Sequence, residues 1–220
     1  KRTIIIIATE NNSKIIPNAI SSPVILHLRN IRLTMVYIVS QRSFICNKKD
    51  NKTKLIVLNG IMIALVCITT MVIQIPIPMT EGYVNIGDSI IFVASILFGP
   101  IPGMIAGGLG SALADILTGY SHWALFTLLI KGFEGYVVGI IVRKNTNLVK
   151  NILATLLGVL IMVSGYLLAG TFLQGSFIIS LGSVPSNTIQ GIVSMVIGIP
   201  IASYLLTVKY VKSFKQISSN

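Results

Sequence analysis

Long apolar segments alternate with short stretches rich in proline, glycine and charge from residue 54 onward. A helix that crosses the hydrocarbon core of a bilayer needs about 20 mostly apolar residues. The pattern predicts six membrane helices, at Leu55–Gln74, Asp88–Phe98, Ile101–Leu117, Ala124–Val142, Ile152–Leu173 and Ser186–Val208. The second segment is too short to cross the core alone, so we expect it to be irregular or buried among its neighbours.

Composition agrees with an all-α integral membrane protein. Hydrophobic residues make up 53% of the 220 residues, charged residues only 10%, and the mean hydropathy is +0.85. Such a chain has too little polar surface to cover a soluble globule, so its partner is expected to be the lipid bilayer. The net charge of +11 does not indicate a nucleic-acid partner, because the basic residues lie between or outside the apolar segments.

The first 53 residues differ from the rest and are predicted to form an N-terminal tail. Their apolar runs, Ile4–Ala8 and Leu33–Val39, are too short to span a bilayer. The first methionine is Met35, so residues 1–34 are expected to be non-native or upstream sequence, partly disordered. We expect the six-helix membrane domain to cover residues 54–212 and a cytoplasmic tail to cover residues 213–220.

The basic residues that flank the apolar segments predict the orientation. All of them fall on one side of the predicted membrane: Lys48, Lys49, Lys52, Lys54, Arg143, Lys144, Lys150, Lys209, Lys212 and Lys215. The loops on the other side, at 75–87, 118–123 and 174–185, contain no lysine or arginine. The positive-inside rule therefore places both termini in the cytoplasm of a bacterial-type plasma membrane.

Charged residues inside the apolar segments are candidates for a site. An ionised group at mid-membrane costs at least about 2.5 to 3.5 kcal/mol on insertion scales, so it should face a partner or a wet cavity. Asp88 begins the second segment, Asp115 ends the third, and Lys131 lies about two turns into the fourth. All three belong to the outer half, and we expect them to converge on one pocket.

Each of these residues also has a structural interpretation. Lys131 and Glu134 are three residues apart on a helix, so they can form a salt bridge as readily as they can bind a ligand. Asp88 stands in a first turn, where capping is the favoured interpretation. Asp115 stands at a helix C-terminus, where the dipole disfavours an anion, so it needs a partner such as Lys131 or a ligand.

Small residues repeat every fourth position in the third segment, at Gly103, Gly107 and Ser111. This spacing lets helix backbones approach closely in lipid, and it predicts a central helix. The pairs Gly60 with Ala64 and Gly135 with Gly139 have the same spacing, and one pair could instead contact a partner subunit.

Amide and aromatic side chains lie near the same outer surface. Asn187 and Gln190 are three residues apart at the start of the sixth segment and can bind either a polar ligand or a neighbouring helix. Trp123 and Tyr83 can stack on a flat heterocycle or belong to an interfacial aromatic belt, which is the better interpretation for Tyr120.

Catalysis has no support in the sequence. The chain contains no P-loop, no nucleophile elbow and no HExxH motif, and its two cysteines, Cys46 and Cys67, form no metal-binding or redox motif. We expect no enzyme activity, no catalytic residues, no cofactor and no metal site.

The order of these motifs resembles a known family. The six-segment layout, the runs Tyr83–Asp88 and Gly99–Asp115, the run Lys131–Gly135 and the run Pro185–Gln190 are similar to those of the substrate-binding S component of energy-coupling factor (ECF) vitamin transporters, in the riboflavin-type group. The resemblance covers about residues 54–212.

The resemblance implies a high-affinity binder of a water-soluble vitamin or vitamin precursor, with an outer pocket and the first outer loop as its lid. The implied binding residues are Tyr83, Asn85, Asp88, Asp115, Trp123, Lys131, Glu134, Asn187 and Gln190. It also implies a transmembrane coupling subunit and two cytoplasmic ATPase subunits as partners. Members of the family carry two alanines on the first helix that face the coupling subunit, and the matching positions here are Gly60 and Ala64.

The ligand and the mode of transport stay open at this stage. Pyridoxine-like compounds, hydroxymethylpyrimidine-like compounds, riboflavin and pantothenate all remain candidates. The mixture of acids, amides, one lysine and aromatic residues favours a small neutral or zwitterionic heterocycle. The alternative function is a self-sufficient secondary transporter or channel that works without ATPase partners.

Overall fold

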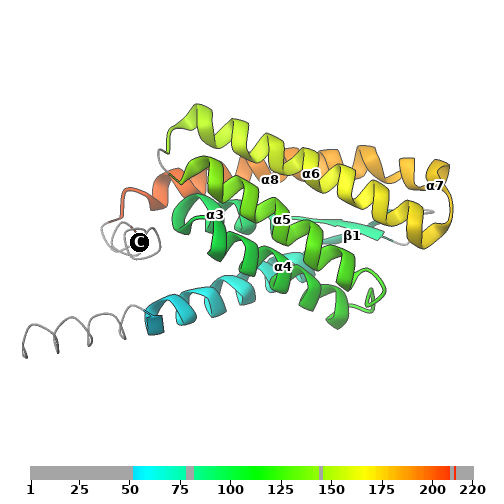
Figure 1. Cartoon of the computed structure of the whole chain (residues 1–220), viewed down its shortest axis with the longest axis horizontal. Coiled ribbons are helices and arrows are strands. Elements are labelled where there is room, and N and C mark those ends of the chain that lie inside the picture. Colours follow the sequence, from blue (N-terminus) through cyan, green and yellow to red (C-terminus); the bar gives the residue numbers. More distant parts are fainter. Residues whose placement is uncertain (1–51, 78–81, 144–145, 209–210, 212–220) are drawn as a thin grey trace, which may run out of the picture. The chain divides into compact units, whose positions relative to one another are not determined.

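The protein is described here by a computed structural model, which covers residues 52–77, 82–143, 146–208 and 211. The predicted tails therefore lie almost wholly outside the described residues. The described part is mostly helical (Figure 1). A first helix, Lys52–Val72, is followed by strands β1 (Gln74–Ile77) and β2 (Gly82–Asn85) and by helices α3 (Gly87–Phe98), α4 (Pro100–Leu117), α5 (Ala124–Val142), α6 (Leu148–Gln174), α7 (Phe177–Leu181) and α8 (Ser183–Leu205).

The long helices match the predicted membrane segments. In the described part of the chain, five helical segments are long and apolar enough to cross a membrane, and α3 is a shorter apolar helix. Helix α6 begins four residues before its predicted start, because the Asn147 side chain caps it by accepting a hydrogen bond from the Lys150 N–H at 2.8 Å. The structure confirms a helical membrane fold.

Helix α3 lies at the centre of this bundle. Every residue of α3 except Ile90 is buried, so the short second segment is a regular helix shielded by its neighbours. Phe92 and Ile96 pack there with Val138 of α5 and Met162 of α6. The sequence predicted α4 as the central helix, but α4 keeps an exposed face that includes Leu109 and Leu113. The small side chains of α4 serve close packing rather than a central position.

Helices α4 and α5 pack through their glycines. A Cβ atom added at Gly107 would come within 2.6 Å of the Lys131 carbonyl oxygen, and one added at Gly108 within 2.8 Å of the Leu128 carbonyl oxygen. Gly139 of α5 is equally tight against the backbone of Pro100. The glycine pair of α5 is therefore used inside the subunit, and the close approach fixes where Lys131 stands.

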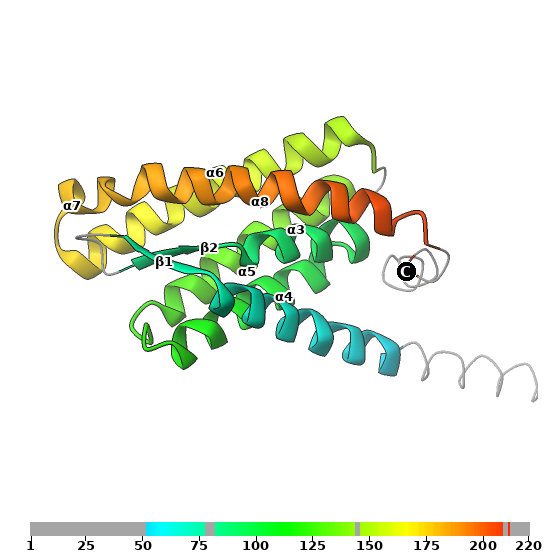
Figure 2. The ribbon, with the colours of Figure 1, turned by 180° about the vertical axis from the view of Figure 1, so that it is seen from behind.

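The segment between the first helix and α3 forms a β-hairpin where the sequence predicted only a loop. Strands β1 and β2 are antiparallel, with Gln74 opposite Asn85 and Pro76 opposite Tyr83. The Gln74 Nε2 atom donates a hydrogen bond to the Thr118 Oγ1 atom at 3.3 Å, which ties β1 to the end of α4. Figure 2 shows the hairpin between α8 and the end of the first helix. The hairpin thus covers one end of the helical bundle.

The segment between α6 and α8, predicted as a loop over 174–185, also has regular structure. It contains the short helix α7, whose N-terminal Ser176 side chain accepts a hydrogen bond from the Ile179 N–H at 3.4 Å. Helix α8 begins at Ser183, three residues before its predicted start.

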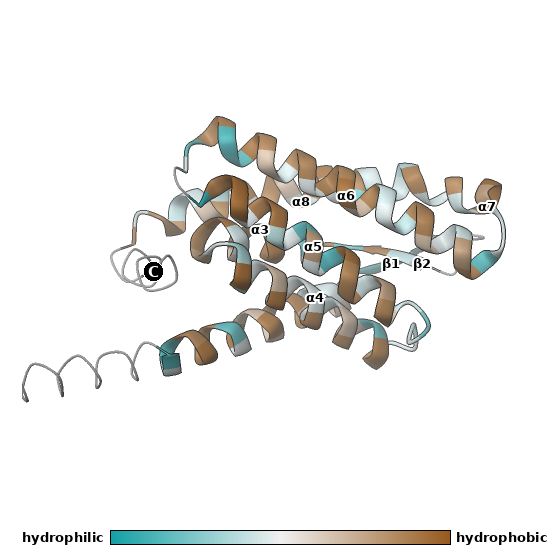
Figure 3. Ribbon diagram, viewed as in Figure 1, coloured by the Kyte–Doolittle hydropathy of each residue, from teal (hydrophilic) through white to brown (hydrophobic). Residues whose placement is uncertain are grey.

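Large apolar side chains are exposed along the long helices. Figure 3 shows how hydrophobic residues predominate along these helices. Leu125 of α5, Leu160 of α6 and Val196 of α8 are 65%, 58% and 68% exposed. Such a surface is unfavourable in water and suited to lipid, so the chain is a multi-pass membrane protein.

Candidate binding site

A buried ion pair lies at the base of the site. The Lys131 Nζ atom on α5 is 2.5 Å from the Asp88 Oδ1 atom in the first turn of α3 and 3.3 Å from the Glu134 Oε2 atom. All three side chains are at most 1% exposed. The sequence left open whether Lys131 and Glu134 form a salt bridge or bind a ligand, and the structure pairs them. For Asp88 the sequence favoured helix capping, but the Gly87 N–H at the start of α3 is bonded by the Asn85 side chain, and Asp88 is instead the main counter-ion of Lys131.

The amide of Gln190 joins α8 to this ion pair. Its Nε2 atom donates to the Asp88 Oδ2 atom at 2.8 Å, and its Oε1 atom accepts from the Asn85 N–H at 2.8 Å. The Asn85 side chain in turn accepts a hydrogen bond from the Gly87 N–H at 2.8 Å, which shapes the turn into α3. Gln190 is therefore held at both ends of its amide, and it links β2, α3 and α8.

A second buried carboxylate, Asp115, stands at the end of α4. The Tyr83 hydroxyl of β2 donates a hydrogen bond to the Asp115 Oδ1 atom at 2.6 Å. Burial and the neighbouring Asp115 carboxylate raise the pKa of the Tyr83 hydroxyl, so this donor keeps its proton. The sequence proposed Lys131 as a partner of Asp115, but Lys131 is bonded to Asp88 and Glu134. Tyr83 is the side chain that compensates Asp115.

Aromatic rings form two walls around these polar groups. The Trp123 and Tyr166 rings meet edge to face with centroids 5.8 Å apart, and the Tyr83 and Tyr120 rings are tilted with centroids 4.7 Å apart. The Lys131 Nζ atom lies 5.5 Å from the Tyr166 ring centroid, within reach of a cation–π interaction. Tyr120, predicted to belong to an interfacial belt, packs against the Tyr83 ring.

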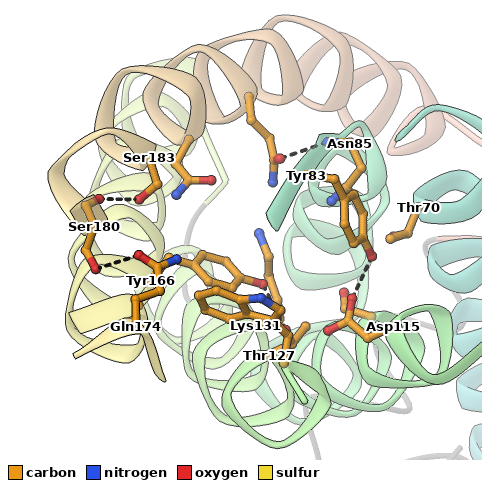
Figure 4. Close-up of a pocket in the computed structure, with 15 residues that line it drawn as sticks. Thr70, Tyr83, Asn85, Asp115, Thr127, Lys131, Tyr166, Gln174, Ser180 and Ser183 are labelled. Carbon is orange, nitrogen blue, oxygen red and sulfur yellow. Dashed lines mark hydrogen bonds between the residues drawn. The ribbon is translucent and has the colours of Figure 1, made fainter. Parts of the chain in front are cut away.

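These residues surround one cavity of about 40 Å³. Figure 4 shows side chains from the first helix, β2, α4, α5, α6 and the α7–α8 segment around it. Its lining consists of Thr70, Tyr83, Asn85, Ser111, Asp115, Trp123, Thr127, Lys131, Tyr166, Gly170, Gln174, Ser180, Ser183, Asn187 and Gln190. The volume accommodates only a few water molecules, so a vitamin-sized ligand must widen the cavity.

Seven of the nine residues predicted for binding line this cavity, namely Tyr83, Asn85, Asp115, Trp123, Lys131, Asn187 and Gln190. Asp88 and Glu134 do not line it. They form salt bridges to the Lys131 ammonium group, which does line the cavity, and so they determine its position and its charge. The two residues predicted for a partner interface, Gly60 and Ala64, are exposed on the first helix, away from the cavity.

Several lining residues were missed by the sequence prediction, above all on α6. Tyr166, Gly170 and Gln174 stand four residues apart, so they share one face of that helix. Ser180 and Ser183 continue the lining between α6 and Asn187, with Ser180 bonded to the Gln174 Oε1 atom at 3.3 Å. A four-residue spacing of polar and small residues in an otherwise apolar helix was the signal that could have found this wall.

The site is suited to binding rather than to bond cleavage. It combines hydrogen-bond donors and acceptors with aromatic walls, which can orient a small flat polar molecule. Among the described residues, no group of three or more histidine, cysteine, aspartate or glutamate side chains could hold a metal ion.

Comparison with known proteins gives one consistent answer. A protein-family model described as ECF-type riboflavin transporter, S component, matches residues 50–207. The chain is 32% identical over 158 residues to the thiamine precursor transporter HmpT of Lactococcus lactis, which covers 71% of this chain and 88% of that protein. It is also 50% identical over 110 residues to an uncharacterized protein of Pyrococcus woesei, covering 50% of this chain and 74% of the relative.

A solved structure shares the fold. The S component for biotin from an ECF-type ABC transporter superposes with a TM-score of 0.52 at 21% identity, over 70% of this chain and 93% of that one. The family match over most of the chain agrees with the motifs at Tyr83–Asp88 and Pro185–Gln190. The chain belongs to the family of ECF-type riboflavin transporter S components.

Proposed function

We propose that this protein is the membrane substrate-binding subunit of an ECF-type importer and captures a water-soluble vitamin or vitamin precursor from outside the cell. The observation that carries the proposal is the cavity itself, a pocket lined by polar and aromatic side chains from five helical segments and a hairpin. The subunit binds its ligand and has no enzymatic activity of its own.

The ligand we propose is a small heterocycle with a single ring. The cavity of about 40 Å³ must widen less for a single ring than for the three fused rings of riboflavin. The relative HmpT is named as a thiamine precursor transporter. Trp123 and Tyr166 supply the faces and edges on which such a ring can rest.

The proposed orientation has six membrane segments and both termini in the cytoplasm of the plasma membrane. The described basic residues Arg143 and Lys150 lie at the α5–α6 connection, at the opposite end of α5 from Trp123. By the positive-inside rule this end faces the cytoplasm, so the cavity opens toward the outside. The hairpin β1–β2 then acts as the outer lid.

The proposed partners are a transmembrane coupling subunit and two cytoplasmic ATPase subunits. The chain lacks a P-loop, so ATP hydrolysis must come from elsewhere. The first helix has the most exposed surface on which a partner could pack. Only 17% of its most apolar 18-residue stretch is buried, the lowest share among the five candidate spans in the described part of the chain. Gly60 and Ala64 lie on its exposed side, and a Cβ atom at Gly60 would meet nothing within 4 Å.

Ligand titration of the purified full-length chain tests the binding function. Trp123 is the only tryptophan of the chain and lines the cavity, so its fluorescence reports ligand entry directly. We expect one member of a panel containing an aminopyrimidine, pyridoxine, pantothenate, biotin and riboflavin to change this fluorescence with a submicromolar Kd. No saturable binding below micromolar concentration by any member would contradict the proposal.

Reconstitution in liposomes distinguishes the proposed function from its rival, a self-sufficient transporter or channel. Liposomes that contain this chain alone should bind the vitamin without accumulating it. Accumulation of the vitamin without ATPase subunits would favour the rival function and contradict the proposal that partner subunits drive transport.

A further inference from the structure

One oxygen of Asp115 stands out among the polar atoms of the cavity. The carboxylate is 3% exposed, and its Oδ1 atom accepts the hydrogen bond from Tyr83. In the part of the chain that the structure describes, the Oδ2 atom is buried and has no hydrogen-bond partner. A buried carboxylate oxygen without a donor is unfavourable, so Oδ2 is an acceptor that a ligand can satisfy.

The neighbouring protein groups do not fill this role. Thr127 on α5 lies close enough to influence the carboxylate, but it makes no hydrogen bond of normal geometry to Oδ2. Lys131, the nearby ammonium group, is 2.5 Å from Asp88 and 3.3 Å from Glu134.

The balance of charge around the cavity points the same way. Three buried carboxylates, those of Asp88, Asp115 and Glu134, stand against the single buried ammonium of Lys131. Lys131 is already paired twice, so it is poorly placed to bind an anionic ligand. This region therefore has an unused hydrogen-bond acceptor, and it favours a ligand that carries N–H donors.

Resting on the proposed vitamin-binding function, we propose that Asp115 is the specificity-determining residue for the ligand, and that its Oδ2 atom accepts a hydrogen bond from an amino group attached to the ligand ring. The ligand class is then an amino-substituted nitrogen heterocycle that rests against Trp123 and Tyr166. Analogues with a carbonyl oxygen in place of the amino group present an acceptor to an acceptor and are rejected, as are ligands whose main group is a carboxylate.

Two pyrimidines of nearly equal size test this assignment on the unmodified chain. The first is 4-amino-5-hydroxymethyl-2-methylpyrimidine, and the second carries an oxo group in place of the 4-amino group. With Trp123 fluorescence as the readout, we expect the amino compound to bind at least about tenfold more tightly than the oxo compound.

The variant Asp115→Asn turns the acceptor into a donor without changing its size. Its remaining oxygen can still accept the hydrogen bond from Tyr83, so we expect the chain to fold. The expected result is an inverted preference, with weaker binding of the amino compound and equal or tighter binding of the oxo compound. The control is Thr155→Val, a change of similar size at a buried polar side chain of α6 that does not line the cavity, and it should leave the ratio of the two affinities unchanged.

The outcomes separate this assignment from the proposed function. If another vitamin of the panel binds tightly while the amino and oxo compounds do not differ, the role of Asp115 is wrong and the binding function stands. Equal weakening of both pyrimidines by Asp115→Asn would likewise overturn the role of Asp115. If no panel member binds at all, the proposed function fails, and this assignment fails with it. If the Asp115→Asn variant does not fold, the affinities of the unmodified chain for the amino and oxo compounds still test the role of Asp115.

Discussion

Lys131 shows how a buried cation in this site depends on its surroundings. Its ammonium group is 1% exposed and is compensated by Asp88 and Glu134. Removing one member of a buried ion pair leaves the remaining charge without compensation, which typically costs about 3 to 5 kcal/mol.

We therefore expect Lys131→Met to destabilise the protein by about this amount, because two carboxylates would lose their common partner. The measurement is the midpoint of thermal unfolding in detergent. Lys150→Met is the matched control, since Lys150 lies at the partly exposed start of α6 and the same change there should have little effect. An unfolding midpoint of Lys131→Met equal to that of the control would contradict this view of the ion pair.

The hydrogen bond from Tyr83 to Asp115 connects the hairpin to α4. Its loss in Tyr83→Phe should lower stability by about 1 kcal/mol or more, because the acceptor is a carboxylate. Tyr120→Phe is the control, since it removes a hydroxyl from the adjacent ring and leaves this bond intact.

The pH dependence of that bond follows from the Tyr83 pKa. Burial and the Asp115 carboxylate raise the pKa of the folded protein's Tyr83 above its ordinary value of 10.0. The stabilisation is then fully present below pH 10 and is lost as the pH rises through the higher folded-state pKa. The difference in unfolding midpoint between the unmodified chain and Tyr83→Phe should therefore stay constant from about pH 7 to pH 9. A difference that changes in that interval would show that the folded-state pKa of Tyr83 lies below its ordinary value.

At the level of elements, the contact of α4 with α5 decides where the polar groups stand. Asp115 belongs to one of these helices and Lys131 to the other, and glycines let their backbones touch. A larger side chain at this contact would separate the helices and move both residues away from the cavity.

Gly108→Leu tests this contact. A Cβ atom at Gly108 would lie 2.8 Å from a backbone oxygen, which cannot move aside, so we expect a loss of about 1 to 3 kcal/mol or more in stability together with weaker ligand binding. Gly60→Leu is the matched control, because a Cβ atom there meets nothing within 4 Å. Equal unfolding midpoints for the two variants would contradict close packing as the role of Gly108.

At the scale of the whole molecule, Gly60→Leu has a second use. The substituted chain should bind its vitamin normally, because Gly60 lies away from the cavity, but it should associate more weakly with a coupling subunit that packs against the first helix. Co-purification with the coupling and ATPase subunits measures the association, and Trp123 fluorescence measures the binding. Unchanged co-purification would exclude this face of the first helix as the contact.

The orientation in the membrane can be tested with single cysteines in a chain whose two native cysteines are replaced by serine. Ser121→Cys lies in the connection between α4 and α5, and Val149→Cys lies at the start of α6, at the other end of the bundle. A membrane-impermeant thiol reagent added to intact cells should label only Ser121→Cys. Labelling of Val149→Cys alone would contradict the proposed orientation and indicate the opposite one.

The sequence by itself determined the class of protein, the course of the long helices and the charged residues of the site. Membrane spans are set by hydropathy along the chain, and a charge inside a span needs a partner or a cavity, so both can be read without coordinates. Tertiary structure alone decided which partner each charge has. Asp88 is bonded to Lys131, which is 43 residues away along the chain, and to Gln190, which is 102 residues away. Tyr83 is bonded to Asp115, which is 32 residues away. Those pairings depend on how closely the helices approach and how the hairpin folds over their ends, and the sequence pattern of a single segment carries neither.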